Sequence, residues 1–190
     1  MRYTITKKPI LKETTIIESY IEDTFVIEDL KKKIDEKIGA LSYKTNVRAE
    51  MTDWKDFLKE ESFKRIMHQN AGLWQSQFKN ITSYYLKDAW GNKLKQNDFV
   101  VEHSHEPSVL SGIIYLTNKG PGTYFPEIDS LIKEEIGKVV LFQSYLKHSV
   151  SEFTFDEFRY TISFNLDLLD RSDEEVNKKF EEVNKKYGNN

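Results

Sequence analysis

The chain has 190 residues, of which 38% are hydrophobic and 31% are charged, a composition typical of one soluble globular domain. The 28 basic and 31 acidic residues give a formal net charge of −3, so the totals indicate no electrostatic affinity for nucleic acid or an anionic membrane. The absence of cysteine excludes disulfides, thiolate metal sites and a cysteine nucleophile.

The N-terminal stretch MRYTITKKPILKETT lacks the apolar segment of a secretory signal. No apolar run approaches the ~18 residues that a membrane-spanning helix needs. We therefore expect a cytoplasmic protein without a membrane segment, and the sequence leaves its oligomeric state open.

The first part of the chain, residues 1–80, is predicted to be an α-rich support for a single domain that spans residues 1–190. A short β-branched segment at 13–19 is compatible with a strand. Between Ile27 and Leu41, apolar side chains recur at intervals of three and four, which predicts an amphipathic helix that ends near Gly39.

Residues 52–78 are expected to form one or two further helices, because large apolar side chains recur there at helical spacing. The polar stretch at 60–62 is predicted to interrupt the pattern, and the segment Asn70–Gly72 to end it. We interpret His68, which lies in this part, as structural or exposed.

Residues 81–170 contain short strand-like segments separated by turns, which predicts a sandwich or a barrel. A Gly-Asn turn at 91–92 is expected to end the first strand, so we place Trp90, Gly91 and Asn92 at a hairpin end. The strands are predicted at residues 83–90, 98–105, 109–117, 122–128, 137–144, 147–154 and 158–168.

The last segment, residues 171–190, is predicted to be a helix. Ser172 and Glu175 have the spacing of a capping box at its start. Acidic residues fill the first turn, and Lys185 and Lys186 lie in the last turn, an arrangement that suits the helix dipole.

Two of the four histidines, His103 and His105, form a His-x-His pair on a predicted strand. Side chains at positions i and i+2 of a strand point to the same face, so both imidazoles can bind one metal ion. Neutral imidazole suits Fe, Zn, Cu and Ni. His148 follows 45 residues later (148 − 103), after enough predicted strands to return beside the pair in a barrel.

The last predicted strand carries a polar face, formed by Arg159, Thr161, Ser163 and Asn165 in alternation with apolar residues. A barrel strand normally turns apolar side chains inward. A cation and hydroxyls near a candidate metal site therefore indicate a binding site for a carboxylate, which arginine binds bidentately. The indication comes from the joint spacing, because each of these residues alone would usually be a surface or core residue.

Residues 98–168 resemble the Fe(II) and 2-oxoglutarate-dependent oxygenases, in particular a branch near the prolyl 4-hydroxylases. The stretches that carry the resemblance are, in chain order, DFVVEHSHEPSVLSGIIYL, GKVVLFQSYLKHSV and FRYTISFNLDL. The resemblance implies a double-stranded β-helix, the jelly-roll or cupin-like fold, as the core of a mainly β protein with flanking helices.

The resemblance also implies a role for each matching residue. His103 and His148 would bind Fe(II), and His105 stands where the family usually has an aspartate or a glutamate. Arg159 and Thr161 would hold the far carboxylate of the co-substrate 2-oxoglutarate, with threonine at a position where serine is usual.

Two residues of the strand at 109–117 complete the expected co-substrate site. In such barrels this strand usually flanks the co-substrate, and Ser111 and Tyr115 share one of its faces. We expect both hydroxyls to donate hydrogen bonds to 2-oxoglutarate. The alternative for the tyrosine is a core position with its hydroxyl satisfied elsewhere.

The histidine at position 105 leaves a second ligand set open. Glu102 or Glu106 could contribute a carboxylate in its place. Glu102 adjoins His103 and should point to the opposite face, whereas Glu106 lies where the strand can bend at Pro107, which makes it a poorer ligand than His105.

The implied activity is hydroxylation of an unidentified substrate by dioxygen, with conversion of 2-oxoglutarate to succinate and CO2. An iron site with open coordination positions is typical of such oxygenases. Two other hypotheses remain: a cupin-like three-histidine metal dioxygenase that uses no oxo-acid, and a non-enzymatic jelly-roll binding module. Nothing in residues 1–80 indicates the primary substrate.

Overall fold

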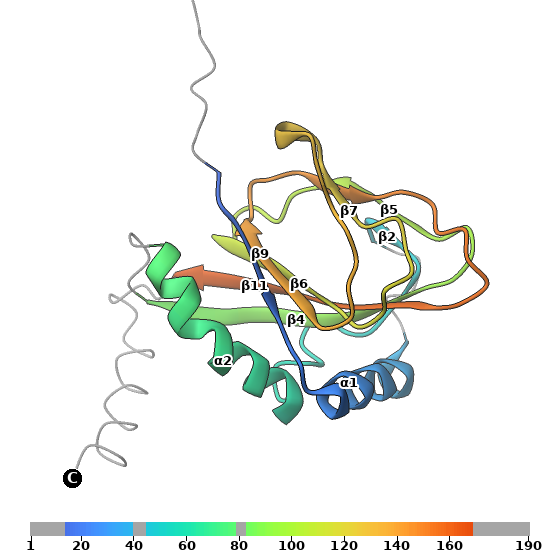
Figure 1. Ribbon diagram of the computed structural model, residues 1–190, viewed down its shortest axis with the longest axis horizontal. Helices are drawn as coiled ribbons and strands as arrows, with labels where there is room; N and C mark the ends of the chain where they lie inside the picture. Colours follow the sequence, from blue (N-terminus) through green and yellow to red (C-terminus); the bar gives the residue numbers. More distant parts are fainter. Residues whose placement is uncertain (1–13, 40–44, 79–82, 169–190) are drawn as a thin grey trace, which may run out of the picture.

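The computed structural model describes residues 14–39, 45–78 and 83–168 (Figure 1). Within these ranges two helices cover one face of a six-stranded sheet, and a five-stranded sheet lies over its other face. The prediction of a mainly β fold with flanking helices is therefore confirmed. The helix predicted at 171–190 lies outside the described residues. Neither of the two described helices is long and apolar enough to cross a membrane.

The larger sheet is antiparallel throughout, with the strand order β1-β9-β6-β11-β4-β3. Its long central strands are rich in β-branched and aromatic residues, which favour extended backbone. The strands are β1 (Ile16–Tyr20), β3 (Glu50–Met51), β4 (Tyr84–Leu94), β6 (Leu110–Tyr115), β9 (Lys138–Gln143) and β11 (Arg159–Leu168).

The smaller sheet has the order β2-β5-β10-β7-β8 and is built from short strands. Antiparallel pairing of β10 with β5 sets His148 opposite His103, so two distant segments meet here. The strands are β2 (Val47–Arg48), β5 (Phe99–His103), β7 (Thr123–Phe125), β8 (Ser130–Ile132) and β10 (His148–Val150), with a 3-10 turn η1 (Pro126–Ile128) between β7 and β8.

Helix α1 (Thr24–Lys37) confirms the amphipathic helix predicted from the sequence. The Asp23 side chain caps its start by accepting hydrogen bonds from two backbone N–H groups. Its apolar face, which includes Leu30 and Ile34, is buried against the larger sheet. Each such fully buried side chain contributes about 1.5–3 kcal/mol to folding.

Helix α2 (Glu61–Gln77) begins at the interruption predicted for residues 60–62, and turns precede it. The predicted stop at Asn70–Gly72 is wrong, because the helix continues for five more residues, to Gln77. The Asn70 amide donates to the Ile66 carbonyl at 2.9 Å and accepts from the Ser19 hydroxyl at 2.5 Å. Its polar groups are satisfied within the packed helix, so it does not end there.

The predicted Gly-Asn turn at 91–92 is also wrong, because β4 runs straight through it. Gly91 pairs with Ile162 of β11, and Asn92 pairs with Met51 of β3. A Cβ atom at Gly91 would lie 2.5 Å from Ile34 Cγ1, so the glycine permits close packing of α1 on the strand.

The two faces of β11 separate as the alternation predicted. Tyr160, Ile162, Phe164 and Leu166 lie in the core formed with the helices. The opposite face, which begins with Arg159, looks toward the smaller sheet. This places the predicted polar face inside the jelly roll rather than on the surface.

Candidate metal centre

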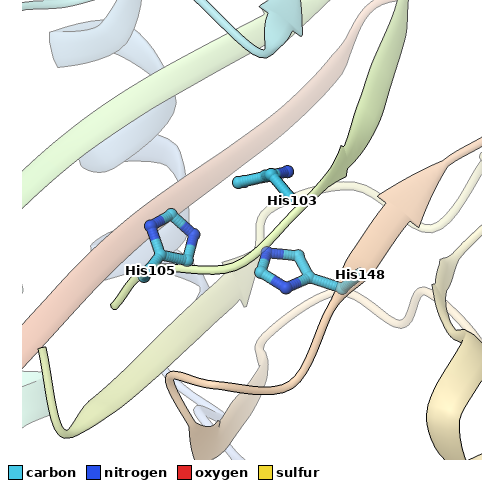
Figure 2. Close-up of side chains that lie close together, drawn as sticks. All are labelled: His103, His105 and His148. Carbon is cyan, nitrogen blue, oxygen red and sulfur yellow. The ribbon is translucent and has the colours of Figure 1, made fainter. Parts of the chain in front are cut away.

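Three histidines lie together between the two sheets (Figure 2). His103 ends β5, His105 follows it in a loop, and His148 opens β10. One nitrogen from each ring lies within 4.8 Å of the other two, and the ring centroids are 4.5–5.1 Å apart. In the part of the chain that the structure describes, no other group of three such side chains could hold a metal ion.

The sequence predicted His105 on a strand, but β5 ends at His103 and His105 lies in the loop that follows. Backbone hydrogen bonds explain why it still faces the cluster. The His105 N–H donates to the Ser144 carbonyl at 2.9 Å, which ties the loop to the end of β9. The His105 carbonyl accepts from the Ser108 N–H at 2.9 Å. These two backbone hydrogen bonds, rather than pairing with a neighbouring strand, hold the loop in position.

Backbone carbonyls set the tautomers of two of the rings. His103 Nδ1 lies 2.7 Å from the Val101 oxygen, and His148 Nδ1 lies 3.1 Å from the Leu146 oxygen. A carbonyl only accepts, so each Nδ1 carries the proton and each Nε2 presents its lone pair. Histidines that bind metals are oriented in this way.

The three imidazoles are neutral at neutral pH. Burial, together with the nearby His148 and His103, lowers the pKa of His105 to about 2. Burial, together with His103, lowers the pKa of His148 to about 3. Burial also lowers the pKa of His103, against the opposing effect of the Val101 carbonyl. Neutral imidazole is the form that binds a metal ion.

The two glutamates considered as alternative ligands lie away from the cluster. Glu102 points outward, and its Oε1 lies 3.6 Å from Lys147 Nζ on the surface. Glu106 is exposed. The group of side chains that could hold a metal contains His105 and neither carboxylate.

A cavity adjoins the histidines and extends along β4 and β11. Its volume is about 40 Å³, counted as the space that the centre of a water molecule can occupy. One water needs about 10–15 Å³ on this measure, so the space holds about three. Trp90 and Asn92 line the cavity, which corrects their predicted place at a hairpin end. The continuous strand β4 turns both side chains, at positions i and i+2, to the same face.

Arg159 and Thr161 lie on the cavity wall, as the face of β11 predicted. Arg159 is 2% exposed, and its Nε donates to the carboxylate of Glu134. Its Nη2 is buried and has no hydrogen-bond partner. The Thr161 hydroxyl oxygen accepts from the Asn92 amide at 3.3 Å, so its proton remains available to donate.

Tyr115 does not line the cavity itself, but it is hydrogen-bonded to Thr123, which does. The Tyr115 hydroxyl donates to Thr123 Oγ1 at 2.7 Å, and Thr123 lines the cavity with a proton left to donate. Burial raises the pKa of Tyr115 to about 12, so the phenol stays protonated. The sequence analysis did not identify Thr123. In the sequence, Thr123 directly follows a Gly-Pro-Gly segment. Such a segment predicts a turn, but it does not tell whether the threonine after the turn is buried or exposed.

Ser111 lies one register position beyond the cavity, beside Asn165. Its hydroxyl lies 2.7 Å from Ser144 Oγ and donates to Asn165 Oδ1 at 2.8 Å. Because the Ser144 carbonyl holds the His105 N–H, this buried network supports the histidine loop. Contact between Ser111 and a co-substrate stays a prediction.

Three buried polar atoms on the cavity wall have no partner among the described residues: Trp90 Nε1, Asn92 Oδ1 and Arg159 Nη2. A buried unsatisfied donor or acceptor costs about 1–3 kcal/mol. Their concentration on one wall indicates that the cavity receives a polar ligand or ordered water.

Residues 127–165 match a family model described as "Putative 2OG-Fe(II) oxygenase". This match includes His148, Arg159 and Thr161 and supports the resemblance predicted from the sequence. No curated protein sequence matches the chain significantly.

Solved oxygenase structures resemble this fold at low sequence identity. A viral collagen prolyl hydroxylase from Paramecium Bursaria Chlorella virus-1 has a TM-score of 0.65 and 15% identity, covering 88% of this chain and 97% of that one. A prolyl-4-hydroxylase from Pseudomonas putida has a TM-score of 0.60 and 13% identity, covering 82% and 93%. HygX from Streptomyces hygroscopicus, with nickel and 2-oxoglutarate bound, has a TM-score of 0.60 and 11% identity, covering 82% and 83%. The double-stranded β-helix fold and the resemblance to this superfamily are confirmed.

Proposed function

We propose that the protein is a non-haem Fe(II) and 2-oxoglutarate-dependent dioxygenase that hydroxylates a primary substrate and releases succinate and CO2. One observation carries the proposal: a single cavity is lined both by three neutral imidazoles and by a buried arginine with a free N–H group. The imidazoles suit a metal ion, and the arginine suits a carboxylate.

The metal ligands are His103, His105 and His148. Two nitrogens that each lie about 2.0–2.1 Å from one metal ion can be no more than about 4.2 Å apart. The three nitrogens already lie within 4.8 Å of one another, so small side-chain rotations bring them to this spacing. Fe(II) bound there supplies the activation of dioxygen that couples oxidation of 2-oxoglutarate to hydroxylation.

The third imidazole changes the charge of the site relative to a site with two histidines and one carboxylate. Three neutral ligands leave the full charge of the metal for incoming ligands, because neither Glu102 nor Glu106 reaches the cluster. An anionic oxo-acid offsets that charge, so this ligand set favours a carboxylate ligand over water.

The far carboxylate of 2-oxoglutarate binds to Arg159, Thr161 and Thr123. Arg159 donates from Nη2, and each threonine has accepted one hydrogen bond and keeps its proton for the ligand. Tyr115 holds Thr123 in place. Trp90 Nε1, which also lies on the cavity wall, is a further unpartnered donor for an oxygen atom of a bound ligand.

The remaining assignments follow from the same framework. We place the protein in the cytoplasm, with dioxygen, 2-oxoglutarate and an unidentified substrate as its partners. The chain acts as one domain, because side chains of α1 and α2 share a continuous core with the larger sheet. Residues 1–80 support the jelly roll rather than carry chemistry.

The test is conversion of 2-oxoglutarate to succinate by purified protein, with and without Fe(II). Turnover is expected to require Fe(II) and to be lost in Arg159→Ala. Arg65→Ala is the matched control, because Arg65 pairs with Asp23 on the surface. Turnover that persists without iron would contradict the proposal.

Two binding measurements distinguish the alternatives. Protein that binds Mn(II) but gives no calorimetric signal with 2-oxoglutarate would favour a three-histidine dioxygenase that uses no oxo-acid. Protein that takes up neither Fe, Mn, Co nor Ni would favour a non-enzymatic jelly roll.

A further inference from the structure

A buried carboxylate lies behind the arginine of the cavity. Glu134 follows β8, and its side chain is 1% exposed. Its Oε1 accepts a hydrogen bond from Arg159 Nε, and its Oε2 is buried without a partner. A Cβ atom at Gly120 would lie 2.6 Å from both Glu134 oxygens, so the loop before β7 packs directly on this carboxylate.

We propose that Glu134 is a positioning residue that fixes the guanidinium of Arg159 and thereby selects the length of the oxo-acid co-substrate. This inference rests on the proposed function. The class of ligand it selects is a dicarboxylic 2-oxo-acid with five carbons in its chain.

The first argument is geometric. A guanidinium is planar, and its five N–H donors have fixed directions. Glu134 holds Nε, and the Tyr115 ring lies 5.7 Å from the guanidinium carbon, so the plane is restrained on two sides. The Nη2 donor then has one direction and one distance from the histidines, because Arg159 and His148 stand on strands of the same rigid jelly roll.

The second argument concerns charge. The Glu134 carboxylate neutralises the Arg159 cation before any ligand enters, and both side chains are almost fully buried. A neutralised arginine attracts distant anions weakly, so a ligand gains mainly from direct hydrogen bonds to Nη2. Only an acid whose far carboxylate reaches Nη2 while its other end lies at the histidines makes those bonds. Chain length, rather than charge alone, then decides binding.

The experiment compares two acids on Mn(II)-loaded protein by calorimetry: 2-oxoglutarate and 2-oxoadipate, which is one carbon longer. Wild-type protein is expected to prefer 2-oxoglutarate by at least about tenfold, the value of one charge-assisted hydrogen bond. Glu134→Ala frees the guanidinium, and the preference is expected to fall below about threefold. Mn(II) affinity stays unchanged, which a general loss of structure would not allow.

Two conservative variants separate orientation from charge. Glu134→Gln keeps an oxygen that accepts from Nε, so it retains the preference while both acids bind more tightly. Glu134→Asp keeps the charge but withdraws the oxygens by one methylene, so it loses the preference. Glu135→Gln is the matched control, because the neighbouring Glu135 is exposed and pairs with Lys138 at 2.7 Å rather than with Arg159. Glu134→Asp also decides the question if Glu134→Ala fails to fold.

The outcomes distinguish the inference from the function on which it rests. If wild-type protein prefers 2-oxoglutarate and Glu134→Asp or Glu134→Ala keeps the full preference, the role of Glu134 is overturned and the oxygenase proposal stands. If Mn(II)-loaded wild-type protein binds neither acid, the proposed function itself fails.

Discussion

The hydroxyl relay from Tyr115 to Thr123 makes a testable prediction about co-substrate affinity. Thr123→Val removes the hydroxyl that faces the cavity and keeps the side-chain shape. The lost hydrogen bond to a carboxylate is worth about 1.5–3 kcal/mol, so the dissociation constant for 2-oxoglutarate is expected to rise by roughly 10–100-fold.

Tyr115→Phe is expected to have a smaller effect, because Tyr115 acts through Thr123 and does not touch the ligand. Its hydroxyl donates to Thr123 Oγ1 at 2.7 Å, so its loss frees the threonine to rotate but removes no ligand contact. We expect a rise of less than about fivefold in the dissociation constant, or less than about 1 kcal/mol. Thr123→Val also leaves the Tyr115 hydroxyl buried without a partner, which costs about 1–3 kcal/mol of stability.

A double-mutant cycle on Mn(II)-loaded protein measures the coupling between the two residues. If Tyr115 acts only through Thr123, the double variant binds 2-oxoglutarate as weakly as Thr123→Val alone. Calorimetry gives the affinities, and urea unfolding checks that each variant is folded. Additive effects, or a larger effect from Tyr115→Phe than from Thr123→Val, would refute the relay.

Three further predictions concern the metal, the helices and the sheet. His148→Ala is expected to abolish stoichiometric uptake of Fe(II) or Mn(II) in metal analysis, whereas His68→Ala, a change at an exposed helix position, leaves it intact. The hydrogen bond from Lys33 lowers the pKa of Glu60, so this contact stabilises the fold above the ordinary pKa of 4.5, and the stabilisation is lost as pH falls through the lowered value. Glu60→Gln should therefore reduce the free energy of unfolding by about 0.5–1 kcal/mol at pH 7, with no difference from wild type in strong acid; equal differences at both pH values would contradict this. Gly91→Ala is expected to cost about 1–3 kcal/mol in urea unfolding through overpacking against α1, and an unchanged midpoint would contradict the packing argument.

The cluster of three histidines could be predicted from the sequence because strand geometry largely determines it. His103 and His105 are two residues apart, and both rings lie in the cluster even though the strand ends at His103. Antiparallel pairing then sets His148 directly opposite His103. The polar face of β11 followed from the same alternation, so a period of two residues was enough to place Arg159 inside.

The wall made by β4 could not be predicted, because tertiary packing overrides a local signal there. Gly91 and Asn92 form a dipeptide that is common in tight turns. The glycine is instead required by the close approach of Ile34 from α1, and Asn92 is paired on both sides within the sheet. Only the position of the helix, which no local pattern contains, distinguishes these two uses of the same residues.

The partners of Arg159 illustrate a second limit. The sequence reveals a buried cation through the alternation of its strand, but it does not reveal which anion compensates that charge. Glu134 lies in a loop near other acidic residues, two of which pair elsewhere: Glu135 with Lys138, and Asp129 with the Tyr124 hydroxyl. It is buried because the loop at Gly120 packs over it, and a carboxylate can be buried there only because Arg159 is present. The pair must therefore be identified from the folded structure, since burying either charge without the other would reduce the stability of the fold.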